Sequence, residues 1–190
     1  MDAKKKRCAK NALMLLLAVG ANCLGSFAAR HITIPLYLDS VLTIAVTAIS
    51  GLGWGIACAV LSNGIMHIAD ATMFPFVLCH ICTALVAHLT FLHYQRSNRK
   101  EPRQSYPIDT FLWAGLWSAL TNAVLGNIIS QILYASLTIP NVDNLVQGIF
   151  IAVQNLTFAT YFGGTLTNLA DKMISATLSY AVYRIACRSA

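Results

Sequence analysis

Long apolar runs recur along the chain and are separated by short polar stretches. Apolar runs of roughly 18 residues or more are typical of membrane-spanning helices. The runs predict helices at 10–29, 39–50, 54–69, 74–94, 109–137 and 165–187. The pattern therefore predicts an all-α membrane protein, a six-helix bundle that forms a single transmembrane domain over residues 1–190.

Glycines interrupt the second apolar region at Gly51, Gly53 and Gly55. If residues 39–69 formed one span, the basic loop at 95–108 would lie outside the cell. The positive-inside rule places that loop in the cytoplasm, together with the basic N-terminus. We therefore expect two short helices, 2 and 3, broken at the glycines. The first of them is too short to cross a bilayer of about 30 Å at 1.5 Å per residue.

The segment 145–163 is apolar enough to span the membrane. If it did, the last helix would carry Arg184 and Arg188 to the outside. A re-entrant segment that closes at Gly163–Gly164 keeps these arginines inside, and it is the favoured prediction over a spanning helix. The expected topology is then N-in and C-in.

Composition agrees with a multi-pass protein of the cell (plasma) membrane. Of 190 residues, 57% are hydrophobic and only 11% are charged, and the formal charge is +6. The placement of the basic residues fits membrane orientation better than nucleic-acid binding. The N-terminal apolar run is read as an uncleaved helix, because no clean cleavage site stands out before Arg30.

An acid and a base stand side by side in the last predicted helix, Asp171 and Lys172. Ionised groups cost roughly 2.5–3.5 kcal/mol each at the centre of a spanning helix, so by default they mark function. Asn168 lies one turn before Lys172 on the same helical face. The alternative is a helix boundary at which both charges are wetted at the surface.

Polar side chains collect in the outer halves of the other predicted helices. The candidate substrate-binding residues are Asn22, Asp39, Asn63, His67, His80, Asn127, Gln131, Asn168, Asp171 and Lys172. Polar groups that faced lipid would be unsatisfied, so we expect a wet, outward-facing pocket for a small polar molecule. The alternative is that these residues join helices to one another, at about 0.6 kcal/mol for each interaction.

Small residues repeat every four positions in the first helix, at Ala21, Gly25 and Ala29. Such a stripe lets a partner helix approach closely.

Cys79 and Cys82 form a C-x-x-C pair, but no second ligand pair has a recognised spacing. We therefore expect no metal, no cofactor and no catalytic residue, and we do not expect an enzyme.

The chain resembles a substrate-binding S component of an energy-coupling factor (ECF) vitamin transporter. The resemblance rests on three stretches in order: 22–40, which includes Pro35 and Asp39; 51–63, with its glycines and Asn63; and 167–172 before the last helix. It implies six helices, high-affinity binding of a micronutrient on the outer side, and two kinds of partner. These partners are a transmembrane coupling subunit and two cytoplasmic ATPases. The chain has no Walker motif, so ATP hydrolysis would be borrowed.

Two other functions stay open at this point. A membrane-embedded ligand sensor would use the same pocket to report to a signalling partner. An intramembrane enzyme would need a reactive cluster, and no serine–base or metal motif has the right spacing. The ligand is also open: Lys172 and the amides could serve a carboxylate or phosphate, whereas Asp39 or Asp171 could serve a cationic or hydrogen-bond-donating ring. Precursors resembling thiamine, riboflavin, folate, cobalamin or a modified base all fit.

Overall fold

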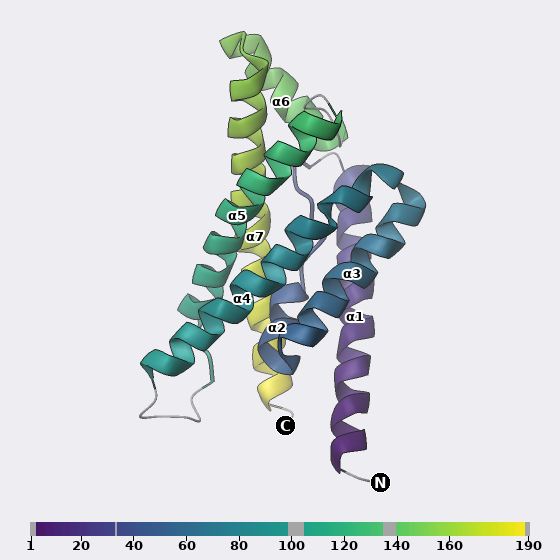
Figure 1. Ribbon diagram of the computed structural model, residues 1–190, viewed down its shortest axis with the longest axis vertical. Coiled ribbons are helices and arrows are strands. Elements are labelled where there is room, and N and C mark those ends of the chain that lie inside the picture. The colour runs from purple at the N-terminus through teal and green to yellow at the C-terminus, as the bar shows by residue number, and fades with distance from the viewer. Residues whose placement is uncertain (1–2, 33, 99–104, 135–139, 189–190) are drawn as a thin grey trace.

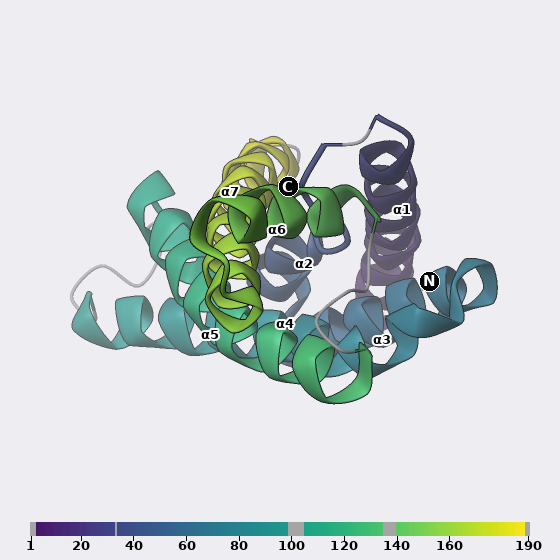
Figure 2. The same ribbon diagram turned by 90° about the horizontal axis from the view of Figure 1, so that it is seen from above.

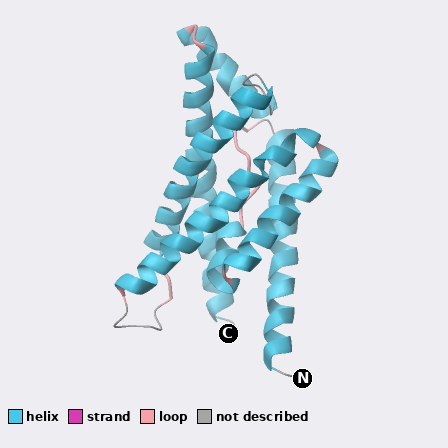
Figure 3. Ribbon diagram, viewed as in Figure 1, coloured by secondary structure: helices cyan, strands magenta, loops and turns pink. Residues whose placement is uncertain are grey.

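A computed structural model describes residues 3–32, 34–98, 105–134 and 140–188 of the chain. Within these residues, seven α-helices and one 3-10 helix account for the regular structure, and no strand is present (Figures 1 and 3). Of the described residues, 89% are helical, so the predicted all-α class is confirmed.

The helices follow one another with short connections. In chain order they are α1 (Ala3–His31), α2 (Thr43–Ser50), α3 (Leu52–Ala69), the 3-10 helix η1 (Ala71–Phe76), α4 (Val77–Ser97), α5 (Ile108–Tyr134), α6 (Pro140–Val153) and α7 (Leu156–Arg188). Among the described residues, four helical stretches are long and apolar enough to cross a membrane, Lys5–His31, Leu52–Ala69, Ala71–Ser97 and Ile108–Tyr134.

Large apolar side chains lie on the outside of the molecule, and many polar ones lie inside. Leu16 is 68% exposed and Ile68 is 85% exposed, whereas Asn22 and Lys172 are buried. A chain surrounded by water would leave large apolar patches uncovered in this arrangement. The same arrangement is favourable for a chain surrounded by lipid, because lipid-facing positions favour apolar side chains and the polar groups find partners within the bundle. The structure therefore fits a protein embedded in a membrane.

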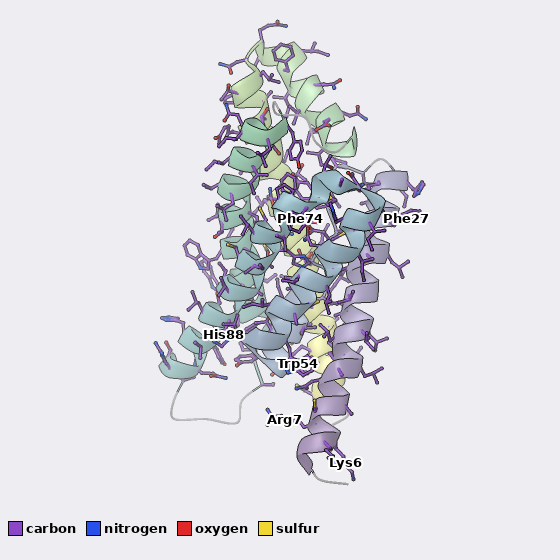
Figure 4. All side chains as sticks on the ribbon, turned by 45° about the vertical axis from the view of Figure 1, so that its right-hand side comes forward. Lys6, Arg7, Phe27, Trp54, Phe74 and His88 are labelled. Atoms are coloured by element: carbon purple, nitrogen blue, oxygen red, sulfur yellow. The ribbon has the colours of Figure 1, made fainter. Side chains whose placement is uncertain are left out.

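The start of α1, the end of α4 and the end of α7 lie at the same end of the molecule (Figure 1). Lys6 and Arg7 lie there, with Phe27 and Phe74 towards the opposite end (Figure 4). We call the first the basic end and the second the distal end. The side of a membrane that each end faces stays a prediction.

The break between the second and third predicted helices is confirmed, and it falls at Gly51. This residue has a φ of 92°, a left-handed conformation that favours glycine. α3 then begins at Leu52 and runs through Gly53 and Gly55. α2 begins at Thr43 rather than at residue 39, because the stretch before it is irregular. α2 therefore has only 8 residues.

The region around 145–163 differs from the predicted re-entrant segment. The chain reverses at Gln154 and Asn155, not at Gly163–Gly164, and α7 runs continuously through both glycines. Gln154 adopts a φ of 54°, and the Asn155 side chain accepts a hydrogen bond from Phe158 N at 3.0 Å. This is the bond of a helix N-cap, so α7 starts here. The result is seven α-helices in the described chain instead of six.

The two glycines serve packing. A Cβ on Gly163 would lie 3.2 Å from Val146 Cγ2 of α6, and one on Gly164 would clash with the Asn127 side chain of α5. The glycines therefore let α6 and α5 approach α7 closely. α6 and the first turns of α7 form a hairpin that projects beyond the other helices at the distal end (Figure 1).

α2 lies inside a ring of longer helices (Figure 2). It contacts α1, α3, α4, α5 and α7, and its residues Thr43 to Thr47 are buried. Ile44 of α2 forms part of a packed core with Phe91 and Phe111, in which Phe91 and Phe111 meet edge to face with ring centroids 5.0 Å apart. The short helix is thus packed among neighbours, as the sequence requires of a segment too short to span.

Candidate functional site

A buried cluster of charges surrounds Lys172 in the middle of α7. Lys172 Nζ lies 2.6 Å from Asp171 Oδ2, 2.6 Å from Ser40 Oγ and 3.2 Å from Asp39 Oδ1. Lys172 is 2% exposed and Asp171 is fully buried, whereas the Asp39 side chain is 21% exposed. Lys172 thus holds two adjacent residues of the stretch before α2, Asp39 and Ser40, and also pairs with Asp171, its neighbour in α7.

The irregular stretch before α2 is anchored by side chains of other elements. Leu38 N donates to Asp171 Oδ1 at 2.6 Å, and Leu42 N donates to Asn22 Oδ1 at 2.9 Å. Ser179 of α7 accepts from Ala45 N at 3.1 Å and donates to Val41 O at 2.9 Å. Non-helical backbone inside a membrane needs such partners, because water is absent there. These bonds fix the position of Asp39.

Strain marks the same stretch. Leu38 has a φ of 47°, in the left-handed region that bulky residues rarely adopt. α1 also comes very close here: a Cβ on Gly25 would lie 2.6 Å from Leu38 O. Strained backbone held in place by its surroundings is concentrated at binding sites. The conformation thus supports a functional role for the segment that carries Asp39.

A cavity lies beside the charged cluster in the distal half of the molecule. The residues that line it come from α1, the stretch before α2, η1, α4, α5 and α7: Ser26, Arg30, Leu36, Tyr37, Asp39, Met73, Phe76, Cys79, Asn122, Gly126, Asn168 and Lys172. It encloses about 520 Å³ including space open to solvent, but the centres of water molecules can occupy only about 30 Å³ of it. That is room for about two or three waters. A vitamin-sized ligand therefore requires the walls to separate.

Arg30, which lines the cavity, forms an ion pair. Arg30 Nη1 of α1 lies 2.8 Å from Asp70 Oδ2, between α3 and η1. Thr72 N also donates to Asp70 Oδ1 at 2.9 Å. Burial opposes ionisation of Asp70, but the hydrogen bonds from Thr72 and Arg30 outweigh it and lower the pKa of the carboxyl. Arg30 and Asp70 therefore form a neutral pair that joins the end of α1 to η1.

Three of the predicted binding residues line this cavity: Asp39, Asn168 and Lys172. Asp171 is not among the lining residues, but it bonds to Lys172 Nζ and to Leu38 N. The candidate residues predicted from the sequence did not include the cavity residues Arg30, Tyr37, Phe76, Asn122 and Gly126. Aromatic and basic residues lie near Pro35 and Pro75 in the sequence, and these two segments form two of the cavity walls. That the two segments meet could not be predicted, because it depends on the fold.

Three other predicted residues form a separate buried network. Asn22 Nδ2 donates to Thr43 Oγ1 and to Ser62 Oγ, each at 3.1 Å. His80 Nε2 lies 2.6 Å from Thr43 Oγ1, and its Nδ1 lies 3.1 Å from Asn63 Nδ2. These side chains join α1, α2, α3 and α4 through one another and do not line the cavity. This geometry is that of interhelical hydrogen bonding.

Replacing Asn22 with alanine is expected to lower the free energy of unfolding by about 1–3 kcal/mol, because it removes a buried amide that bonds to Thr43 and Ser62 and leaves the part-buried Leu42 N–H without its acceptor. Chemical unfolding in detergent measures the effect. Asn11→Ala is the control in the same helix, since Asn11 accepts one bond, from Ser50 Oγ, in a part-buried position. Equal stability of both variants would contradict the network.

The remaining candidates lie at the distal end, where Asn127 is buried and the other two are exposed. His67 Nδ1 is 3.3 Å from Ala71 O and is exposed. Asn127 Nδ2 donates to Tyr161 O at 3.2 Å, and Gln131 Oε1 accepts from Tyr161 OH at 3.2 Å. The structure does not bring these three residues to the cavity; they hold η1 and the start of α7. A role for them in ligand binding stays a prediction.

The small-residue stripe of α1 faces its own chain. Ala29 is buried, and a Cβ on Gly25 would meet Leu38 and Val41. Ala21 lies one turn earlier and is half-buried. At Gly25 the stripe allows close packing against the segment before α2, which is not a helix. Docking of a partner helix along it stays a prediction.

Comparison with known proteins adds no assignment to this geometry. No protein-family model, no curated protein and no solved structure matches the chain. The function is therefore argued from the residues and their arrangement.

Proposed function

We propose that this chain is the substrate-binding subunit of an ECF-type micronutrient uptake transporter in the plasma membrane. The observation that carries the proposal is the cavity of the distal half, where six segments converge beside buried charges. Charges inside a membrane protein are costly and mark substrate sites by default. A concave site with a few placed polar groups suits a small molecule.

The orientation follows from the basic residues. Lys5, Lys6 and Arg7 at the start of α1, Arg96 at the end of α4 and Arg184 near the end of α7 gather at the basic end (Figure 1). The positive-inside rule places this end in the cytoplasm. The cavity then lies towards the outside, where a binding subunit for uptake meets its substrate.

Transport requires partners that this proposal takes from the resemblance: a transmembrane coupling subunit and two cytoplasmic ATPases. α1 offers a face for contact within the membrane, because Leu13, Leu17, Leu24 and Phe27 are exposed along one side of it. Lipid covers this face when the chain is alone. The coupling subunit would replace the lipid there.

The test begins with the whole protein purified in mild detergent. Mass spectrometry of small molecules released on denaturation is expected to find a bound micronutrient. The same compound, added back, is expected to raise the melting temperature through its binding to the folded state. A protein that releases nothing and whose melting temperature no vitamin changes would contradict the proposal.

Asn168→Ala tests the site itself and is expected to weaken binding of the identified compound at least tenfold. The control is Asn98→Ala at the basic end. Both side chains donate to a backbone carbonyl four residues earlier, Asn168 to Gly164 O at 2.8 Å and Asn98 to Tyr94 O at 3.1 Å. The two variants therefore lose a similar bond, but only the first alters the cavity. Unchanged affinity in Asn168→Ala would place the ligand elsewhere.

A further inference from the structure

The donors of Lys172 are all used within the protein. An ammonium group has three N–H donors and no acceptor. Lys172 Nζ is within hydrogen-bond distance of three oxygens, those of Asp171, Ser40 and Asp39. A ligand carboxylate or phosphate would therefore find no donor at Lys172 unless it displaced a carboxylate of the protein. The positive charge of Lys172 therefore balances the neighbouring carboxylates in the cavity wall and is not offered to a ligand.

With both carboxylates ionised, the cluster as a whole carries a net negative charge. Both oxygens of Asp171 accept hydrogen bonds, from Leu38 N and from Lys172 Nζ, and these bonds favour the ionised form of the carboxylate. One lysine thus faces two carboxylates, those of Asp39 and Asp171. The Arg30–Asp70 pair adds no net charge. The charged groups at the cavity sum to one negative charge, and Asp39 is the member that lines the cavity.

Two amide side chains of the cavity wall, Asn122 and Asn168, donate their N–H groups to partners within the protein. Their oxygens are the ends left to accept a hydrogen bond. Thr83 Oγ1 donates to Cys79 O at 3.1 Å, so it can only accept from Asn122, whose Nδ2 lies 2.9 Å away. Asn122 Oδ1 is then fixed as the free end, and among the described residues it has no hydrogen-bond partner. Asn122 is 3% exposed and lines the cavity. A buried acceptor without a partner is costly, so a ligand donor would be favourable there.

Asn168 has the same polarity. Its Nδ2 donates to the backbone carbonyl of Gly164 at 2.8 Å, and a carbonyl can only accept. The oxygen of Asn168 is thus the amide end directed to other partners. With Asp39 and Asn122, three residues that each carry an acceptor oxygen, from three elements, line one cavity.

The walls between these acceptors are flat and apolar. Tyr37, Met73 and Phe76 line the cavity. Phe76 is itself stacked on Tyr134, with ring centroids 6.2 Å apart and an interplanar angle of 15°. A planar ring fits against such surfaces, because offset stacking on an aromatic face is favourable.

We propose that the ligand is a planar nitrogen heterocycle that presents N–H donors or a positive charge to Asp39, Asn122 and Asn168, rather than an anion held by Lys172. This inference rests on the proposed function and names the substrate class of that same site. N–H donors of the ligand would bond to these acceptors. A positive charge on the ligand would also neutralise the excess negative charge. An anion would add a second negative charge in a medium of low dielectric constant.

Matched probes test the ligand class. Thiamine, adenine and guanine carry donors or a positive charge on a planar ring, and nicotinate, biotin and pantothenate are anions. At equal concentrations the first group is expected to contain the compounds that raise the melting temperature of the purified protein. Tight binding of an anion that is lost in Lys172→Met would overturn the inference and leave the proposed function standing. If no probe binds and no small molecule is released on denaturation, the proposed function fails, and the inference fails with it.

Asp39→Asn tests the role of the carboxylate. The variant keeps the size of the side chain and leaves Lys172 paired with Asp171, so the fold is expected to survive. Affinity for the bound donor or cation is expected to fall at least tenfold, and more for a charged probe than for a neutral one. Asp109→Asn, the same change at the basic end in the first turn of α5, is expected to leave affinity unchanged. Equal affinity in Asp39→Asn and Asp109→Asn would overturn the inference.

Asn122→Leu keeps the inference testable if Asp39→Asn proves unstable. It removes the unpartnered acceptor with little change in volume. A retained melting temperature of the ligand-free protein with weaker binding of the same probe is expected. Unchanged binding would remove Asn122 from the site and overturn the three-acceptor arrangement.

Discussion

Replacing Lys172 with alanine is expected to lower the free energy of unfolding by about 3–5 kcal/mol, because it leaves buried carboxylates without their counter-ion. Asp171 is fully buried, and its Oδ2 lies 2.6 Å from the ammonium that the change removes. Asp39 loses the same partner at 3.2 Å. Chemical unfolding of the detergent-solubilised protein measures the loss.

The control separates charge from packing. Lys6→Ala removes an exposed lysine at the start of α1 and is expected to have no measurable effect. Adding Asp171→Asn to Lys172→Ala is expected to restore part of the lost stability, since it removes the carboxylate that is most deeply buried. If Lys172→Ala were as stable as the unchanged protein, the cluster would not be a balanced buried ion network.

The sequence located this cluster because charge inside an apolar helix is unusual. Asp171 and Lys172 were singled out because ionised groups inside a membrane-spanning helix are unfavourable in free energy, and Asp39 was placed at a similar depth. The pairing of Lys172 with Asp39 and Ser40 could not be read from the sequence. It depends on the irregular stretch before α2, whose path is set by Asp171, Asn22 and Ser179. The choice between an anionic and a cationic ligand therefore had to wait for the structure.

Helical periodicity assigned polar residues to faces but not to partners. Asn22 and Asn168 look alike in the sequence, since each is an amide in a long apolar helix. In the structure, Asn22 is consumed by Thr43, Ser62 and Leu42 N, whereas Asn168 lines the cavity. The difference is set by which neighbouring helix each residue meets.

Glycines also had two meanings that the sequence could not separate. Gly51 ends a helix, as its left-handed backbone requires. Gly163 and Gly164 were read in the same way, yet both lie inside α7 and admit the side chains of α6 and α5. The reversal instead depends on Asn155, whose side chain caps α7. A glycine pair in an apolar run thus indicates either a turn or a close helix contact.

Gly115 provides the second large effect, because it sits where α5 crosses α7 at the charged cluster. A Cβ at this position would lie 2.7 Å from Ala176 Cβ and 2.8 Å from Lys172 O. One of these contacts is with backbone, which yields less readily than the end of a side chain. Gly115→Ala is therefore expected to force α5 and α7 apart and to lower the free energy of unfolding by about 1–3 kcal/mol.

The matched variant predicts a change of opposite sign. Gly64 lies inside α3, and a Cβ there would meet nothing within 4 Å. Gly64→Ala is expected to raise the free energy of unfolding by about 0.5–1 kcal/mol, since alanine loses less conformational freedom than glycine in a helix. Unfolding in detergent compares the two variants directly. Because Gly115 packs against the backbone of Lys172, its variant is also expected to weaken ligand binding, and Gly64→Ala is not. Stabilisation by both alanines would mean that α5 and α7 do not meet closely at the cluster, and the position of Lys172 beside the cavity would lose its support.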